Sequence, residues 1–138
     1  MMEEIIISDD KSKLDIELIH KFLTTSYWAK GRTIDEVKNS IEHSICFGVY
    51  KDGKQIGFAR ILTDYTVIAY LMDVFILEEF RGKGFSKLLL KRIFDDDKFK
   101  RVKKWMLATK DAHSLYAQFG FGEIKNPDRL MEKVVLRK

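Results

Sequence analysis

The sequence is poor in cysteine and proline, and it contains no long apolar run. Cys46 is its single cysteine, so the chain cannot form an internal disulfide, which fits a reducing compartment. Apolar stretches such as 74–77 and 88–90 are far shorter than the roughly 20 residues that cross a bilayer, and no secretory signal pattern is visible. These absences favour a soluble, cytoplasmic protein without a membrane partner.

The composition fits one compact domain, because 138 residues, 46% of them apolar, can bury a core without disulfides or metals. We therefore expect a single domain over 1–138. Twenty-five basic residues against 21 acidic ones give a mild net charge of +4. The basic segment 98–104 is typical of a solvated surface or of a nucleic-acid-binding face, but the acidic residues 95–97 interrupt such a face. We expect no nucleic-acid partner. No metal site is expected either, because the histidines and the cysteine lack metal-ligand spacing.

Apolar periodicity and turn signals divide the chain into strands and helices. The expected strands are 4–8, the hairpin arms 45–50 and 55–63, 66–77, 105–108 and 130–136. The expected helices are 13–24, a second one from the capping-box residue Thr33 through Ile41, about 84–95, and 111–119 with Asp111 as N-cap. In the helix at 84–95, the residues expected to face the core are Phe85, Leu88, Leu89 and Ile93, with Phe94 as a further candidate. This order predicts an α/β fold: a single-domain mixed, mostly antiparallel sheet flanked by helices.

A glycine-rich turn joins the strand at 66–77 to the following helix. It reads Arg81-Gly82-Lys83-Gly84-Phe85-Ser86-Lys87. A helix N-terminus has unpaired N–H groups and a partial positive charge, and glycines let the backbone approach an anion closely. The turn differs from a Walker loop and from the three-glycine dinucleotide fingerprint. Alone, it is also typical of an ordinary solvated turn.

A second segment lies about thirty residues downstream and reads Leu115-Tyr116-Ala117-Gln118-Phe119-Gly120-Phe121. The ring of Tyr116 can lie against the core while its hydroxyl reaches a cleft. The alternative is a core tyrosine whose hydroxyl bonds a backbone carbonyl.

Together the two segments resemble the GNAT superfamily of N-acetyltransferases. That superfamily has an acyl-CoA loop of the form Arg/Gln-x-x-Gly-x-Gly/Ala after an apolar strand, and a Leu-Tyr-x-x-x-Gly-Phe segment downstream. The sequence departs from the pattern at Ser86, where the family prefers Gly or Ala, and at Thr109, where many relatives have an asparagine. The resemblance implies an acyl-CoA N-acyltransferase-like fold. It also implies transfer of an acetyl group from acetyl-CoA to a primary amine by direct attack in a ternary complex.

The resemblance also implies roles for individual residues. The main chain of Val74, Phe75 and Ile76 would pair with the pantetheine arm, and the N–H of Val74 or Phe75 would face the acyl carbonyl. Tyr116 would be the general acid, since a phenol with a pKa of about 10 is protonated at neutral pH. The expected cofactor-binding set is Val74, Phe75, Ile76, Arg81, Gly82, Lys83, Gly84, Phe85, Ser86, Lys87 and Thr109.

The acceptor amine must lose a proton, and Asp73 is the first candidate base because it interrupts an apolar strand beside Val74. The alternative is a carboxylate that points to solvent from the opposite face of the strand. His113 is the second candidate, because an imidazole titrates near neutral pH.

The acceptor site is walled, in this superfamily, by the connection between the first two helices. Here that connection offers Ser26, Tyr27, Trp28 and Arg32 as substrate-binding residues. The aromatic rings can stack on an apolar or cationic group, and Arg32 can hold a carboxylate or phosphate. Alternatively, the two rings fill the core, or Asp64 attracts the amine.

The acceptor can be a small molecule or a protein amine. A non-catalytic coenzyme A-binding or anion-sensing module is the main alternative function, with a nucleic-acid-binding module third. Monomer and homodimer both remain open, because the apolar segment 130–136 can pair across a dimer.

Overall fold

The computed structural model describes residues 4–135 and divides the chain into two compact units, Met1–Ala108 and Thr109–Lys138. The first unit holds a five-stranded sheet in the order β1-β2-β3-β4-β5. Its strands are β1 (Ile5–Ser8), β2 (Ile45–Lys51), β3 (Lys54–Thr63), β4 (Ile68–Ile76) and β5 (Lys104–Leu107). Its α-helices are α1 (Ile16–Thr24), α2 (Ile34–Glu42) and α3 (Phe85–Phe94). Three short 3₁₀ turns complete it: η1 (Lys11–Lys13), η2 (Glu78–Phe80) and η3 (Asp97–Phe99).

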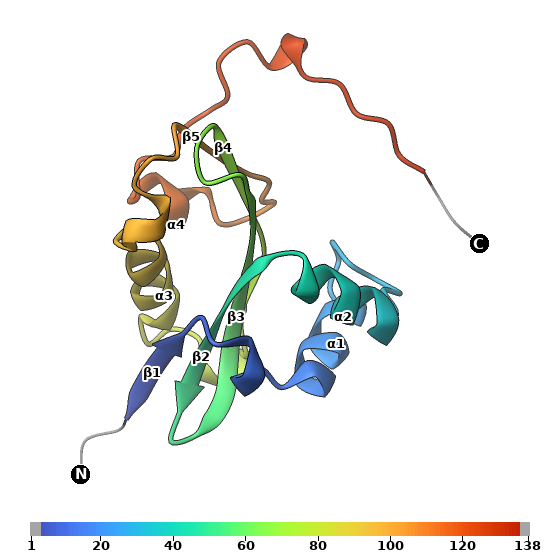
Figure 1. Cartoon of the computed structure of the whole chain (residues 1–138), viewed down its shortest axis with the longest axis vertical. Helices are drawn as coiled ribbons and strands as arrows, with labels where there is room; N and C mark the ends of the chain where they lie inside the picture. The colour runs from blue at the N-terminus through green and yellow to red at the C-terminus, as the bar shows by residue number, and fades with distance from the viewer. Residues whose placement is uncertain (1–3, 136–138) are drawn as a thin grey trace. The chain divides into compact units, whose positions relative to one another are not determined.

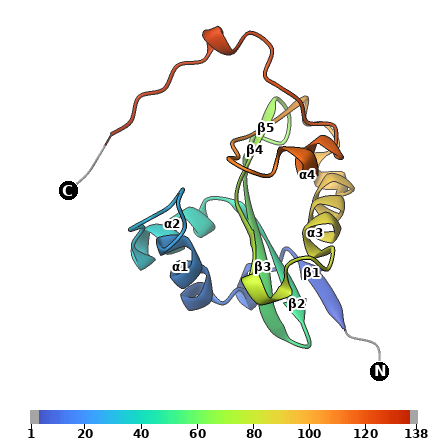
Figure 2. The same cartoon turned by 180° about the vertical axis from the view of Figure 1, so that it is seen from behind.

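The sheet is mixed and mostly antiparallel. Strands β1 to β4 pair antiparallel with their neighbours, and only β4 and β5 run parallel. Helices α1 and α2 cover one face of the sheet and α3 covers the other (Figure 1). The view from behind shows the same three layers (Figure 2). The predicted fold class is therefore confirmed.

Each face of the sheet has its own apolar layer. On the α1–α2 face, Cys46 is 1% exposed and packs in a cluster with Phe58 and Phe75. Its thiol is a small core group, and burial raises its pKa to about 11. On the α3 face the prediction for Leu88 is wrong, because Leu88 is 47% exposed and Leu90 is buried in its place.

The second unit contains the helix α4 (His113–Ala117) and the turn η4 (Pro127–Arg129). The predicted N-cap is wrong: Ala112 occupies that position, and the Thr109 Oγ1 accepts its N–H at 3.1 Å. The predicted strand at 130–136 is also wrong for residues 130–135, which have no regular structure, while Leu136 lies outside the described residues. A strand needs a pairing partner, and none of the strands within residues 4–135 pairs with this segment.

Helices in the described part of the chain are all too short or too polar to cross a membrane.

Candidate functional site

The turn before α3 has the conformation that its glycines predict. Gly82 and Gly84 have φ angles of 78° and 84°, in the left-handed region that favours glycine. A Cβ built on either residue would meet no atom within 4 Å, so both Cα atoms face open space. This open side lets a ligand approach the backbone closely, which fits the phosphates of an acyl-CoA.

The first turn of α3 offers backbone donors that have no hydrogen-bond partner among residues 4–135. Helical bonding begins with the N–H of Leu88, which donates to the carbonyl of Gly84 at 3.1 Å. The N–H groups of Phe85, Ser86 and Lys87 precede this bond, and Gly84 supplies no side-chain cap. With the exposed Lys83 and Lys87 beside them, these groups form an electropositive cradle for an anion.

Arg81 is engaged within the turn. Its Nε donates to the carbonyl of Ile76, the last residue of β4, at 2.9 Å. Arg81 therefore anchors the turn to the strand, and the carbonyl of Ile76 already accepts one hydrogen bond. Val74 and Phe75 are also predicted to contact the pantetheine arm. Unlike the carbonyl of Ile76, their main-chain carbonyls accept no side-chain hydrogen bond within residues 4–135.

Strand β4 carries a bulge where the sequence predicts the acyl carbonyl. Phe75 pairs with Phe58 and Met72 pairs with Arg60, so two residues, Asp73 and Val74, lie opposite one. Asp73 has a φ of 55°, which accommodates the extra residue. The bulge interrupts the regular pairing of β3 and β4 at Asp73 and Val74.

Over the same stretch, the other edge of β4 is not paired with any strand of the first unit. Pairing with β5 begins at Ile68 and ends with Leu71 opposite Leu107, although β4 continues to Ile76. Among the described residues, no strand pairs with this edge beyond Leu71. An extended ligand can therefore pair with the main chain of β4 there, in the manner of an added strand.

Asp73 is buried and is the centre of a polar cluster, so it is not the solvent-facing carboxylate of the alternative prediction. Its side chain is 1% exposed. Oδ1 accepts the indole N–H of Trp28 at 2.9 Å. Oδ2 accepts Nη1 of Arg32 at 2.7 Å and Nε of Arg60 at 2.9 Å. One carboxylate thus joins the connection between α1 and α2 to strands β3 and β4.

The cluster keeps Asp73 ionised. Burial by itself would raise the pKa of this carboxyl, but the hydrogen bond and charge of Arg60, followed by those of Arg32, outweigh it. The pKa is therefore held below its ordinary value of 3.8. A carboxylate with a lowered pKa and three donors is a weak proton acceptor.

Arg60 and Ser44 belong to this cluster, and neither was predicted from the sequence. Arg60 is 6% exposed and its Nη1 donates to the Oγ of Ser44 at 3.0 Å. The available signal is a pair of opposite charges, Arg60 and Asp73, each flanked by apolar residues in one of two consecutive strands. Buried charges need partners, so the two could have been paired from sequence.

The predicted acceptor residues lie together on the connection between α1 and α2. Trp28 is 40% exposed and Tyr27 is 59% exposed, so neither ring fills the core. Their rings meet edge to face, with centroids 5.2 Å apart. The hydroxyl of Ser26 donates to the carbonyl of Leu23 at 2.7 Å and accepts the N–H of Ala29, so it shapes the connection.

Asp64 has a local role in the turn between β3 and β4. Its Oδ1 accepts the N–H groups of Thr66, Val67 and Ile68, and these bonds lower its pKa. Its carboxylate oxygen is thus already used by the backbone.

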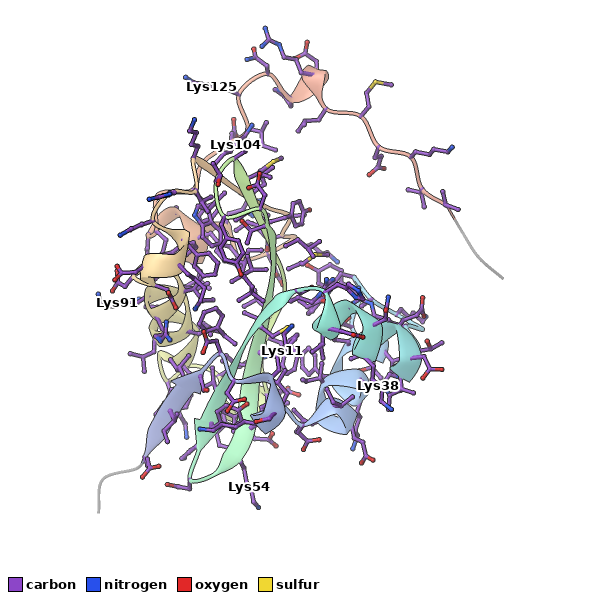
Figure 3. The ribbon with its side chains drawn as sticks, in the orientation of Figure 1. Lys11, Lys38, Lys54, Lys91, Lys104 and Lys125 are labelled. Carbon is purple, nitrogen blue, oxygen red and sulfur yellow. The ribbon has the colours of Figure 1, made fainter. Side chains whose placement is uncertain are left out.

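The basic residues of the first unit are spread over separate elements. Lys11, Lys38, Lys54 and Lys91 extend from η1, α2, the β2–β3 hairpin and α3 (Figure 3). In the basic segment 98–104, the Nζ of Lys98 is neutralised by Asp9 at 2.6 Å and by Asp96 at 2.7 Å. This distribution does not favour a continuous nucleic-acid-binding face.

In the second unit, Tyr116 lies within α4. Its carbonyl accepts the N–H groups of Phe119 and Phe121 where the helix ends, and Gly120 has a φ of 91° there. The rings of Tyr116 and Phe121 are T-shaped, with centroids 5.9 Å apart. His113 begins the same helix. The helix therefore ends before Gly120, as the sequence predicts.

Comparisons with known proteins point to one family. A family model described as an acetyltransferase (GNAT) domain matches residues 42–123. A GNAT-family protein of Xanthomonas campestris pv. campestris, known from a crystal structure, is 44% identical with a TM-score of 0.92, covering 96% of this chain and 94% of that one. An uncharacterized N-acetyltransferase of Porphyra purpurea, ycf52, is 26% identical over 133 residues, 92% of this chain and 74% of the relative. Glucosamine-6-phosphate N-acetyltransferase of Arabidopsis thaliana has the same fold, with 19% identity, a TM-score of 0.65, and 97% and 99% of the two chains covered.

Proposed function

Since the chain belongs to the GNAT acetyltransferase family, whose members are acyl-CoA-dependent, we propose that it transfers an acetyl group from acetyl-CoA to a primary amine by direct attack in a ternary complex. The observation that carries this proposal is the open glycine turn before α3 beside the unpaired edge of β4. A substituted-enzyme route would need an activated nucleophile, and the thiol of Cys46 is buried with a raised pKa.

The donor is held by main-chain groups. Bound acetyl-CoA supplies the activated acyl group as a thioester. The N–H groups of Gly82 through Lys87 bind its phosphates, with Lys83 and Lys87 adding charge, while Arg81 fixes the turn. Val74 and Phe75 offer main-chain groups to the pantetheine arm. The N–H of Val74, at the bulge, stabilises negative charge that develops on the acyl oxygen.

In this proposal, one residue protonates the leaving group and another contacts the bound donor. Tyr116 donates a proton to the departing thiolate, and Thr109 contacts the donor arm, as the family motif suggests. We also propose that residues 1–138 form a single domain. The hypothesis that Asp73 is the base stays a prediction. Its lowered pKa favours a positioning role, with the amine proton passing to water.

The glycine turn is tested by replacing Gly84 with valine. Gly84→Val should weaken acetyl-CoA binding about ten- to a hundredfold, because the side chain would block charge-assisted hydrogen bonds from the backbone to the phosphates. Isothermal titration measures the dissociation constant.

Gly53→Val is the matched control. Gly53 has a φ of 85°, against 84° for Gly84, and its added Cβ would also meet no atom within 4 Å. Both variants therefore carry the same backbone strain, about 1–2 kcal/mol. Equal affinity for acetyl-CoA in the two variants would place the phosphates elsewhere.

A further inference from the structure

The charges of the Asp73 cluster do not cancel. One carboxylate faces two guanidinium groups, those of Arg32 and Arg60, so the cluster keeps one surplus positive charge. Arg60 is buried, and its other hydrogen bond within residues 4–135 goes to the hydroxyl of Ser44. The side chain of Arg32 is 20% exposed. The surplus charge therefore reaches solvent at Arg32.

Arg32 has donors to spare. Nη1 donates to Oδ2 of Asp73 at 2.7 Å, which restrains the guanidinium, and within residues 4–135 no hydrogen bond from its other N–H groups is found. A guanidinium presents its donors as a fork that matches the two oxygens of a carboxylate or phosphate. An arginine that is already held loses little side-chain freedom when it binds such an anion.

An exposed aromatic surface is tied to the same carboxylate. The indole N–H of Trp28 donates to Oδ1 of Asp73, while Arg32 donates to Oδ2. Trp28 is nevertheless 40% exposed, and Tyr27 lies edge-on to it. The two oxygens of one side chain thus orient a cation and an aromatic ring. Val74 follows Asp73 in the sequence, and in the proposed function its N–H lies beside the acyl group.

From this geometry we propose, on the basis of the acetyltransferase function above, that the acceptor is an amine that also carries an anionic group and an apolar group. Arg32 binds the anion, a carboxylate or a phosphate, and Trp28 packs against the apolar part. Asp73 is a positioning residue that acts through both. A diamine or polyamine lacks the anion and would be a poorer acceptor, because its second cation would face the surplus charge of the cluster.

Two probe pairs isolate the anion. Phenylalanine and phenethylamine differ in the carboxylate, and 2-aminoethyl phosphate and ethanolamine differ in the phosphate. Binding is measured by the fluorescence of Trp28. The sequence has two tryptophans, so the measurement uses a Trp105→Phe variant in which Trp28 alone remains. In the presence of coenzyme A, the anionic member of one pair should bind about ten- to a hundredfold tighter than its partner.

The preference should disappear in Arg32→Gln and return only in part in Arg32→Lys, which restores the charge without the fork. Lys30→Gln, which removes an exposed cation from the same connection, should retain it. Asp73→Asn should raise the KM for the anionic probe more than the KM for its neutral partner, because Arg32 loses the carboxylate that orients it. A purely structural role would not produce this split.

The outcomes separate the inference from the proposed function. A preference in the carboxylate pair or in the phosphate pair identifies the anion. Equal affinities within both pairs, or a preference that survives Arg32→Gln, would overturn the inference even if acetyl-CoA binds and thiol is released. Failure to bind acetyl-CoA, with the anion preference intact, would instead count against the acetyltransferase reaction.

Discussion

Replacing Asp73 with asparagine is expected to lower the free energy of unfolding by about 3–5 kcal/mol, because it leaves buried charge without its partner. Arg60 is 6% exposed and would lose the carboxylate that Nε now contacts at 2.9 Å. Arg32 would lose its fixed position at the same time. Urea unfolding, followed by circular dichroism, measures the change.

A surface pair provides the control for the Asp73 variant. Asp95 pairs with Lys91 at 2.8 Å, but both side chains are well exposed, at 65% and 71%. Asp95→Asn should therefore change the free energy of unfolding by less than about 1 kcal/mol. A similar loss in the two variants would mean that burial of the Asp73 cluster adds nothing to its stability.

Acidity should remove the stabilisation that Asp73 provides. The pKa of Asp73 is lowered in the folded protein, so the folded state favours the ionised carboxylate. Its contribution is complete above the ordinary pKa of 3.8 and is lost as the pH falls through the lower folded value. The difference in stability between wild type and Asp73→Asn should thus be constant near neutral pH and shrink below about pH 4.

The glycine turn could be predicted from sequence because its features are local. The positive φ angles of Gly82 and Gly84 and the start of α3 follow from the order of residues alone. The same holds for the capping box that Thr33 and Glu36 form at α2.

The Asp73 cluster could not be predicted in full because it is assembled across the sheet. Asp73 meets Trp28 and Arg32 over 45 and 41 positions of sequence, and the bulge that aims its side chain depends on register. A regular β4 would alternate its side chains, so the sequence leaves open which way Asp73 points. The exchange of Leu88 for Leu90 in the core also depends on tertiary contacts, because packing against the sheet decides which side of α3 is buried.

Replacing Tyr116 with phenylalanine is expected to lower kcat about ten- to a thousandfold, because the reaction would lose one acid catalyst. The change removes a single oxygen from a ring that contacts Phe121, so the packing within the second unit should persist. The dissociation constant for acetyl-CoA should change little, since the phosphates bind elsewhere in this proposal. Thiol release under saturating substrates measures kcat, and isothermal titration measures binding.

The pH profile gives the Tyr116 variant a more specific test, because an acid catalyst must be protonated. In the wild type, kcat should fall at alkaline pH as the phenol ionises, and in Tyr116→Phe this alkaline limb should be absent. Tyr65→Phe, at an exposed tyrosine of the β3–β4 turn, should keep both the rate and the limb. An unchanged kcat in Tyr116→Phe, or an alkaline limb that persists there, would assign the proton to another donor. The Leu115–Phe121 motif would then serve the fold of the second unit rather than the chemistry.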